Sequence, residues 1–531
     1  MKEFNTTAVC IPSKHYMVDI TERIKSIKQL VDDGKYFTIN RARQYGKTTT
    51  LNALAAYLSS SYDVLSIDFQ DVTDALFISE NDYVKGLAKL LCDLKDTVEA
   101  PINSDIYDDL NSLGRLDGEA NLNDLFRIFD SWARENEKPL VLIIDEVDNP
   151  ANKKVFLDFL GKLRSSYLKR ETNPKYKTFQ SVILAGVTDI KHLKSKIRDD
   201  DSQETNSPWN IATDFNIDMS LTQEGIYGML LDYENDHNTG MDIDAISRLI
   251  YEYTNGYPYL VSRICQLIDV IIAPQMNSIE NAWTKQGVEE AVKRILSDGN
   301  DTLFQSLINK LDNLTQIRES IRSVLMEGIK LAYNPDQPEI SIMEMYGFIR
   351  NDHNTVRIAN RIFETRLYNY FLSNEEIKSN IFSKEGDFGK SIFVQDSKLN
   401  MPLIMEHFIS TYNEVFGPLE DKFKEKDGRE LFLLYLKPII NGTGNYYIEA
   451  QTRDQTRTDI IIDYLGNQYI VEMKIWRGQS YNEAGEQQIS EYLDYFNLTT
   501  GYMLSFNFNK KKEVGVRRVE IGNKVLFEGM L

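Results

Sequence analysis

One short stretch constrains the fold of this chain more than any other: residues 38–50, with the sequence TINRARQYGKTTT. It follows a short apolar segment and precedes an apolar-periodic one, a pattern that predicts strand, tight loop and helix. Gly46, Lys47 and Thr48 then form the end of a phosphate-binding loop. Glycine lets the backbone approach a phosphate, lysine reaches the β- and γ-phosphates, and the threonine hydroxyl ligates magnesium. The free amides of the helix N-terminus face the anion.

The loop departs from the pattern GxxxxGK[ST] at its first position, where this chain has Arg41 in place of glycine. Taken alone, the stretch is therefore also compatible with an ordinary basic turn at the start of a helix. The candidate nucleotide-binding residues of the loop are Arg43, Gly46, Lys47, Thr48 and Thr49.

A second motif favours the nucleotide interpretation. The run LVLIIDEVDN is apolar and β-branched and ends in Asp145 and Glu146, which is typical of a strand buried on both faces of a parallel sheet. Acids at its carboxyl end are expected beside the phosphate loop. Asp145, with Thr48, would hold magnesium, and Glu146 would polarise the attacking water. The two motifs together predict ATP and Mg²⁺ as cofactors.

Composition excludes several classes of protein. The net charge of −20 argues against a nonspecific polyanion binder, because DNA affinity depends on neutralising phosphates. The chain has no apolar run of membrane-spanning length, and its N-terminus lacks a signal-peptide core. Three scattered cysteines and five histidines predict neither a disulfide framework nor a zinc site. We therefore expect a cytoplasmic protein with no membrane partner.

Further segments extend the nucleotide-binding domain. An apolar strand over residues 180–188 ends at Thr188, a candidate sensor of the γ-phosphate; a turn-forming role is the alternative. Residues 254–259, TNGYPY, interrupt two predicted helices and resemble the Gly-x-Pro element of signal-transducing ATPases, which reaches the nucleotide from a helical lid. Residues 315–372 predict a winged helix, which either binds DNA or packs internally as an arm.

A second chemical motif lies near the C-terminus. Two predicted strands, 457–464 and 468–476, flank Gly466-Asn467, which we take as the two turn residues of a hairpin. Counting outward, Asp459 lies opposite Lys474, and Ile461 lies opposite Glu472. The period of two then places Asp459, Glu472 and Lys474 on one face.

Two carboxylates and a lysine on one face could bind magnesium or manganese, generate a hydroxide and offset charge on a scissile phosphate. Asp459 and Glu472 are the candidate metal ligands. The alternative is a cross-strand salt bridge on a half-buried hairpin, and a slip of one residue in register would break the predicted face.

The chain resembles bacterial AAA-ATPase-like proteins that carry a C-terminal PD-(D/E)XK nuclease-like domain. The resemblance rests on the loop RARQYGKT (41–48) and on Asp459, Glu472 and Lys474 followed by Gln488 and Tyr492. It implies that Arg41 is compatible with nucleotide binding. It also implies an αβββαβ nuclease core, Gln488 as a further catalytic residue, and Glu430 on the first helix as an extra acid.

These inferences predict an α/β protein with a P-loop (ASCE-type) NTPase parallel sheet, a helical lid, a winged-helix-like segment and a smaller αβββαβ PD-(D/E)XK nuclease-like domain. The expected boundaries are 1–220 for the ATPase core, 221–300 for the lid, 301–373 for the winged-helix-like segment, 374–400 for a linker and 401–531 for the nuclease-like domain.

The leading hypothesis for function is an ATP-binding and ATP-hydrolysing protein coupled to a magnesium-dependent DNA endonuclease. It would act as a homo-oligomer on DNA, in mobile-element or phage (antiviral) defence. The alternative is an ATP-driven switch whose C-terminal domain binds nucleic acid or a protein partner without cutting. A third possibility is an ATPase that has lost turnover because of its altered loop.

Overall fold

The computed structural model forms two compact units. Unit 1 comprises Met1–His237, Gly256–Arg263 and Ile342–Gly347, and unit 2 comprises Asn238–Asn255, Ile264–Ser341 and Phe348–Leu531. The residues that the structure describes are 2–70, 72–98, 102–151, 153–187, 209–276, 278–326, 329, 331–378, 390–395, 398–416, 425–440, 444–451, 457–476, 478–507, 509 and 512–531.

Unit 1 is built on a parallel sheet of four strands in the order β1-β4-β3-β2. The strands are β1 (Phe37–Asn40), β2 (Asp63–Asp68), β3 (Leu140–Asp145) and β4 (Ser181–Gly186). The predicted phosphate loop follows β1 directly, and the acidic motif ends β3. The strands are parallel, so the phosphate loop after β1 and the acidic motif after β3 both lie at the carboxyl edge of the sheet. The end of β4 lies between them.

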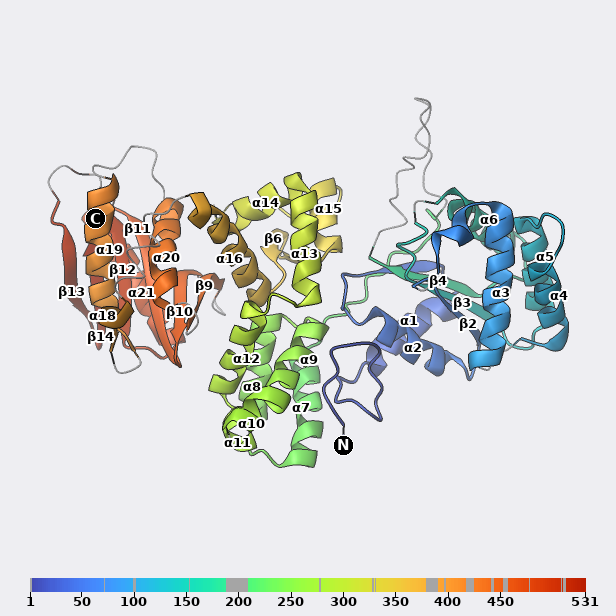
Figure 1. Ribbon diagram of the computed structural model, residues 1–531, viewed down its shortest axis with the longest axis horizontal. Coiled ribbons are helices and arrows are strands. Elements are labelled where there is room, and N and C mark those ends of the chain that lie inside the picture. Colours follow the sequence, from blue (N-terminus) through green and yellow to red (C-terminus); the bar gives the residue numbers. More distant parts are fainter. Residues whose placement is uncertain are drawn as a thin grey trace, which may run out of the picture. The chain divides into compact units, whose positions relative to one another are not determined.

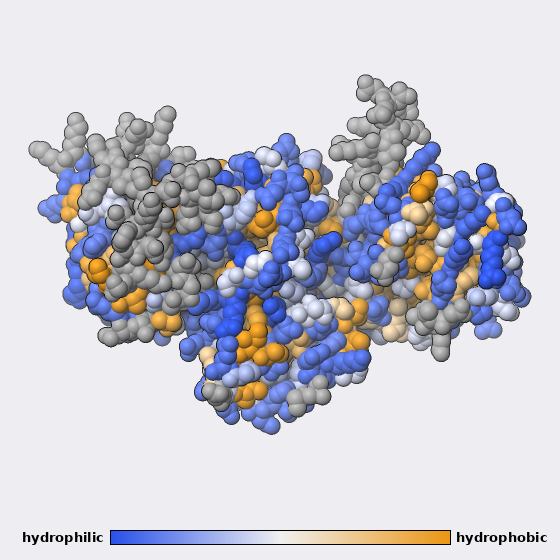
Figure 2. Space-filling model, in the orientation of Figure 1, coloured by the Kyte–Doolittle hydropathy of each residue, from blue (hydrophilic) through white to orange (hydrophobic). Residues whose placement is uncertain are grey.

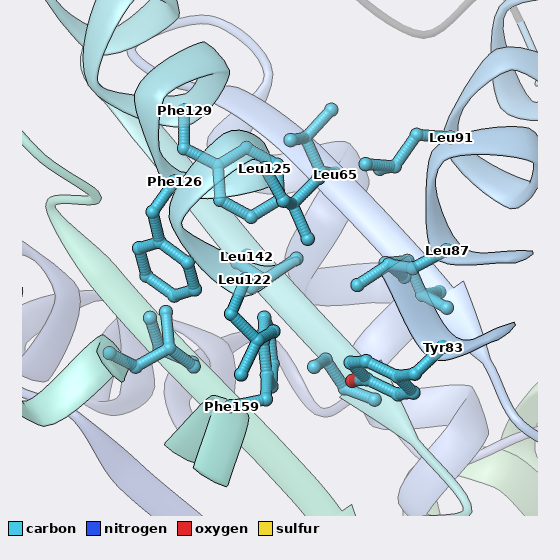
Figure 3. Close-up of a cluster of buried hydrophobic side chains, with 14 of the residues drawn as sticks. Leu65, Tyr83, Leu87, Leu91, Leu122, Leu125, Phe126, Phe129, Leu142 and Phe159 are labelled. Carbon is cyan, nitrogen blue, oxygen red and sulfur yellow. The ribbon is translucent and has the colours of Figure 1, made fainter. Parts of the chain in front are cut away.

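Both faces of this sheet are buried, which explains its nearly continuous apolar strands. Alternate residues of β3 enter opposite cores: Leu142 faces the cluster shown in Figure 3, whereas Val141 and Ile143 face the other core. Helices α1 (Thr21–Asp32) and α2 (Lys47–Leu58) cover one face. The other is covered by α3 (Glu80–Val98), α4 (Ser104–Gly114), α5 (Leu122–Glu135) and α6 (Lys154–Thr172), with η1 (Asp74–Phe77) (Figure 1).

Lid helices and a winged-helix-like segment follow the sheet. The lid comprises α7 (Gln223–His237), α8 (Ile243–Thr254), α9 (Pro258–Leu267), η3 (Ile268–Ile272), α10 (Ala273–Met276), α11 (Ile279–Ala282) and α12 (Lys285–Ser297). The winged-helix-like segment comprises α13 (Thr302–Asn313), α14 (Thr315–Met326), α15 (Pro338–Met345), the hairpin β5 (Ile349–Asp352)–β6 (Thr355–Ile358), and α16 (Arg361–Lys378).

The C-terminal part of unit 2 holds a mixed sheet of six strands in the order β13-β14-β12-β11-β10-β9. The strands are β9 (Gly444–Gln451), β10 (Arg457–Tyr464), β11 (Asn467–Ile475), β12 (Thr500–Phe506), β13 (Gly515–Ile521) and β14 (Lys524–Met530). Three short elements come earlier in the sequence: α18 (Lys390–Phe393), β7 (Val394–Gln395) and β8 (Lys398–Leu399).

Helices cover both faces of the six-stranded sheet. Helix α21 (Gln479–Tyr495) packs its Ile489 and Tyr492 on Ile470 and Met503, which share one face. Helices α19 (Met401–Phe416) and α20 (Glu425–Ile440) pack elsewhere on the sheet; the Tyr412 ring, for example, lies 5.9 Å from the Phe506 ring. Phe506 follows Met503 by three residues, so it lies on the opposite face. The predicted αβββαβ order is present from α20 to β12, with α19 added before it and β13–β14 after it.

The predicted register of the β10–β11 hairpin is wrong. Tyr464 pairs with Asn467, so the two turn residues are Leu465 and Gly466, and both have positive φ (48° and 78°). Ile461 therefore pairs with Ile470 rather than with Glu472. The partner of each β10 residue is displaced by two positions, which is a full period of the side-chain alternation, so the assignment of residues to faces is unchanged.

Charged side chains on α12, α16 and β10 form a cluster inside unit 2. Burial raises the pKa of Asp463 on β10, and Arg361 on α16 and Lys285 on α12 counteract part of that rise. Burial also raises the pKa of Glu289 on α12 to about 7, with a further contribution from Asp463. The Lys285 ammonium lies 3.7 Å from a Glu289 carboxylate oxygen. The acids of this cluster are Glu289 and the buried Asp463, and its bases are Arg361 and the exposed Lys285.

The exposed surface is mainly polar. On the face shown in Figure 2, hydrophilic residues predominate and hydrophobic residues form separate small groups. The most exposed large hydrophobic side chains, Ile78 at 77% and Val270 at 61%, belong to different units. Among the helices that the structure describes, none combines the length and the apolar composition that a membrane crossing requires.

The charged cluster predicts a pH dependence of stability. Because the folded-state pKa of Glu289 is raised, the wild type should lose stability as pH rises from its ordinary pKa of 4.5 to about 7. The variant Glu289→Gln has no ionisable group at this position, so its stability should not fall over that pH range. After discounting for partial exposure, we expect its advantage in unfolding free energy to be about 1 kcal/mol larger at about pH 8 than at about pH 5. Denaturant unfolding at both pH values measures this, and an equal difference at both would contradict it.

Candidate functional site

The phosphate loop is arranged around Lys47, the first residue of α2. The Lys47 side chain is only 6% exposed, and its ammonium donates to the carbonyl oxygens of Arg41 at 3.1 Å and Ala42 at 3.2 Å. Gly46 caps α2 with φ of +79°, a left-handed conformation that favours glycine. The loop therefore curves around a buried cation at the N-terminus of a helix, which is the geometry of an anion site.

The phosphate loop and the acidic motif are in direct contact. The Thr48 hydroxyl donates to Asp145 Oδ2 at 2.8 Å, and the Glu146 amide donates to Asp145 Oδ1 at 2.9 Å. Burial raises the pKa of Asp145, and the hydrogen bond from Thr48 counteracts part of that rise. A hydroxyl and a carboxylate at this separation are oxygen ligands of the kind that Mg²⁺ prefers, so these residues fit a magnesium ion.

Glu146 has the properties of a group that accepts a proton. Burial raises its pKa, Lys47 counteracts the rise, and the neighbouring Asp145 and Asp148 add to it. Its φ of +54° is left-handed, which is uncommon for a residue other than glycine and is typical of functional sites. Burial also lowers the pKa of Lys47, and the same three acids oppose that shift. The site thus combines one cation with several acids at a strand end.

Arg41 stands where the usual pattern has glycine, and the structure shows how the loop accommodates it. Its φ is not left-handed, so this position does not require glycine. The guanidinium donates to the carbonyl oxygens of Asn40 at 2.7 Å and Ile217 at 2.8 Å. It also lies 5.4 Å from the centre of the Phe215 ring, within the range of a cation–π contact. Arg41 thus anchors the start of the loop to the segment that precedes the lid.

The remaining predicted nucleotide-binding residues have different positions. Arg43 has an exposed side chain in the loop. Thr49 accepts a hydrogen bond from the Cys10 amide at 3.1 Å, so its hydroxyl holds the N-terminal segment against α2. Thr188, the predicted γ-phosphate sensor, lies outside the described residues. Close to it, the Val187 amide donates to Asp148 Oδ2 at 2.7 Å.

Tyr257 is a contact of the phosphate loop that the sequence analysis missed. Its hydroxyl donates to the Arg43 carbonyl oxygen at 2.5 Å, and its ring meets the Tyr45 ring edge-on at 4.8 Å. Tyr257 is the middle residue of the Gly-x-Pro element, a position that the resemblance left unspecified. Gly256 before it has φ of +70°, and a Cβ there would lie 2.0 Å from the carbonyl oxygen of Leu221. Gly256 therefore makes a backbone contact with the segment before α7 that only glycine allows, and Tyr257 next to it contacts the loop.

The predicted nuclease residues form a second connected site. Glu472 on β11 is 1% exposed, and its Oε1 lies 3.0 Å from the Lys474 ammonium. The Gln488 side chain on α21 donates to Glu472 Oε1 at 2.7 Å and accepts from Lys474 Nζ at 3.1 Å. The Gln488 amide also lies 2.7 Å from the Tyr492 hydroxyl. Gln488 therefore orients the acid and the lysine together.

The second predicted metal ligand, Asp459, lies in β10, but its side chain is outside the described residues. The observed register reaches Ile460 opposite Val471, and one further step would set Asp459 opposite Glu472. In the described part of the chain, no group of three or more His, Cys, Asp or Glu side chains is arranged to hold a metal ion. Glu430 lies on α20, which packs against β10 and β11.

Two family models match this chain. The model of the AAA-like domain matches residues 4–372, more than half of the chain, and that region includes the phosphate loop, the acidic motif and the lid. The model of the PD-(D/E)XK nuclease superfamily matches residues 445–519, which include β10, β11 and α21. A search of curated protein sequences finds no match.

Several solved structures also align with this chain. A Walker-type ATPase of Pyrococcus abyssi has 12% identity and a TM-score of 0.46, over 68% of this chain and 99% of that one. The ORC2 protein of Aeropyrum pernix, in ADPNP–ADP complexes, has 14% identity and a TM-score of 0.35, over 67% and 93%. The RuvB Holliday junction branch migration motor of Thermotoga maritima has 11% identity and a TM-score of 0.30, over 64% and 92%.

Replacing Arg41 by the glycine of the usual pattern should destabilise the folded protein without abolishing nucleotide binding. Arg41→Gly removes two side-chain hydrogen bonds and a cation–π contact, so we expect a loss of about 1–3 kcal/mol in unfolding free energy. ATP affinity should stay within about tenfold of the wild type, because that loop position tolerates glycine in P-loops. Thermal unfolding and ATP titration measure the two effects. Arg43→Ala, at an exposed arginine, is the stability control, and an unchanged stability of Arg41→Gly would contradict the anchoring role.

Proposed function

The chain belongs to the AAA-like domain family, and on that premise we propose that it binds and hydrolyses ATP and couples turnover to a metal-dependent DNA endonuclease. One observation supports both activities. At each of two sites, a buried acid lies near a cation and accepts a hydrogen bond from a residue distant in the sequence: Asp145, near Lys47, accepts from Thr48, and Glu472, next to Lys474, accepts from Gln488. Acids and cations in this combination are what phosphate chemistry requires.

At the ATPase site, the residues have separate roles. Lys47 and the α2 amides bind the β- and γ-phosphates, and Thr48 with Asp145 would hold Mg²⁺, which neutralises charge on the phosphates when bound. Glu146 orients the attacking water and accepts its proton, a role that suits a carboxylate whose pKa burial has raised. Thr188 and Arg43 are proposed to contact the γ-phosphate side of the nucleotide.

At the nuclease site, Glu472 with Asp459 would hold Mg²⁺ or Mn²⁺, which activates water and polarises the scissile phosphate when bound. Lys474 lies next to Glu472 and offsets the charge that develops on the phosphate. Gln488 keeps both side chains in position through its two hydrogen bonds. The proposed substrate is DNA, cut by an oligomer of this chain in the cytoplasm, in mobile-element or phage defence.

A second candidate function is an ATP-driven switch whose C-terminal domain binds nucleic acid or a protein without cutting. The net charge of −20 favours it, since a DNA-cutting protein must neutralise phosphates at its own surface. In that case Glu472 and Lys474 would form a structural ion pair, held by hydrogen bonds to Gln488, rather than a catalytic site.

Two substitutions separate ATP binding from ATP hydrolysis. Glu146→Gln should retain ATP binding and lower the turnover rate by about 100-fold or more, because it removes the group that accepts the proton. Lys47→Ala should weaken ATP binding by about tenfold or more, because it removes the cation inside the loop. Nucleotide titration and phosphate release measure these effects. Wild-type turnover in Glu146→Gln would refute its assigned role, and nucleotide bound by the wild type without phosphate release would support an ATPase that has lost turnover.

Cleavage of plasmid and single-stranded DNA with Mg²⁺ or Mn²⁺, with and without ATP, tests the nuclease. Glu472→Ala and Lys474→Ala should each lower the cutting rate by about 100-fold or more, and ATP binding should survive in both. Glu491→Ala, which removes an exposed acid of α21, is the matched control and should cut normally. If Glu472→Ala and Lys474→Ala still cut DNA at the wild-type rate, the assignment of the site is wrong. No cutting by the wild type under any condition would favour the switch.

A further inference from the structure

The side chain of Tyr257 reaches the phosphate loop from the segment between α8 and α9. Its hydroxyl donates to the Arg43 carbonyl oxygen at 2.5 Å, and the residue is only 2% exposed. Tyr257 and the loop both belong to unit 1, so this contact lies inside one compact body. A tyrosine from outside the loop thus sets the direction of one carbonyl group within it.

The direction of the carbonyl groups changes at Arg43. The two carbonyl oxygens before it accept from the Lys47 ammonium, whereas that of Arg43 accepts from Tyr257. Among the described residues no peptide bond is cis, and in a trans peptide the C=O and the following N–H point in opposite directions. The Gln44 N–H therefore points away from Tyr257.

Gln44 has the backbone conformation of an anion-binding loop. Its φ is +57°, whereas the φ of Arg43 before it is not positive. A left-handed residue that follows one of ordinary conformation turns successive N–H groups toward one side, which makes a concave site for anions. A residue other than glycine adopts a left-handed conformation only at a cost in energy. Gln44 therefore needs a contact that holds the backbone in this shape, and Tyr257 supplies one.

Tyr257 is itself held in a fixed position. Its ring meets the Tyr45 ring edge-on at 4.8 Å, and the Tyr45 hydroxyl lies 2.8 Å from that of Ser220. The preceding residue, Gly256, has φ of +70°, and its carbonyl oxygen accepts from the Leu221 amide at 2.8 Å. Contacts on the ring and on the adjacent backbone therefore keep the hydroxyl aimed at the loop.

We propose that Tyr257 is a positioning residue for ATP: it holds the peptide plane between Arg43 and Gln44 so that the Gln44 N–H faces the phosphates. Backbone N–H groups of such loops cradle phosphates. Without the hydroxyl, that plane can rotate and turn the Arg43 carbonyl oxygen toward them, and a carbonyl oxygen repels the anion that an N–H attracts. Tyr257 acts through the loop and does not touch the nucleotide. The inference rests on the proposed function of the ATPase site and does not depend on the nuclease.

Titration of the full-length protein with ATP and with inorganic tripolyphosphate, which has neither base nor ribose, tests this role. Tyr257→Phe keeps the ring packed on Tyr45 and removes only the hydroxyl. It should raise the dissociation constants of both ligands by about fivefold, which corresponds to the loss of one hydrogen bond. Tyr57→Phe, at a tyrosine of α2 that is 42% exposed, is the matched control and should bind both ligands like the wild type.

Replacing Gln44 by glycine supplies a second readout. Gln44→Gly removes the side chain that makes the left-handed conformation unfavourable, so the loop then depends less on Tyr257. In the Gln44→Gly background, Tyr257→Phe should therefore raise the two dissociation constants by less than about twofold. A hydroxyl that serves only the stability of the fold would give the same factor in both backgrounds, and that result would overturn the proposal.

The outcomes separate this inference from the proposed function. A wild type that binds neither ATP nor tripolyphosphate would refute both. If the wild type binds ATP, an unchanged affinity of Tyr257→Phe, or a loss confined to ATP, would overturn the positioning role and leave the ATPase proposal standing. A wild type that binds ATP but not tripolyphosphate would do the same.

Discussion

Burial of charge is the constraint on which the sites of this protein depend. A charged side chain can leave water only where an opposite charge or several polar groups are held next to it. Lys47 has the acids at the end of β3, and Glu472 has Lys474 and Gln488. Each arrangement fixes the position of at least two separate elements, so the same contacts that compensate charge also define the tertiary structure around the sites.

The two sheets provide these positions in different ways. In unit 1, parallel strands buried on both faces bring the phosphate loop and the acidic motif to one edge, although β4 separates their strands. In the C-terminal domain, an antiparallel hairpin presents Glu472 and Lys474 on the face that α21 covers, and α21 supplies Gln488. In unit 2, the Arg361 guanidinium of α16 lies 4.8 Å from the centre of the Tyr253 ring of α8. At both proposed sites, the side chains assigned to the chemistry therefore also hold separate elements together.

The sequence predicted which strands and helices carry the charged groups of the sites more accurately than it predicted which residues those groups contact. The strand that ends at Asp145, the strand that carries Glu472, and the αβββαβ order around it agree with the structure. The register of the β10–β11 hairpin was wrong because Leu465 adopts the left-handed conformation that the prediction reserved for glycine and asparagine. The assignment of β10 and β11 residues to the two faces of the hairpin is nevertheless unchanged, since a displacement of two residues preserves the alternation of side chains.

The sequence by itself determined the local chemistry: a lysine and a threonine at a helix start, acids at a strand end, and an acid-x-lysine pair on a strand followed by a glutamine on a helix. Those features depend on near neighbours and on the period of each element, which the order of residues encodes directly. Only the tertiary structure decided that Arg41 anchors the loop to Ile217, that Tyr257 contacts Arg43, and that Asp463 is buried. These contacts join segments up to 214 residues apart, and such pairs are set by the packing of whole elements rather than by any local pattern.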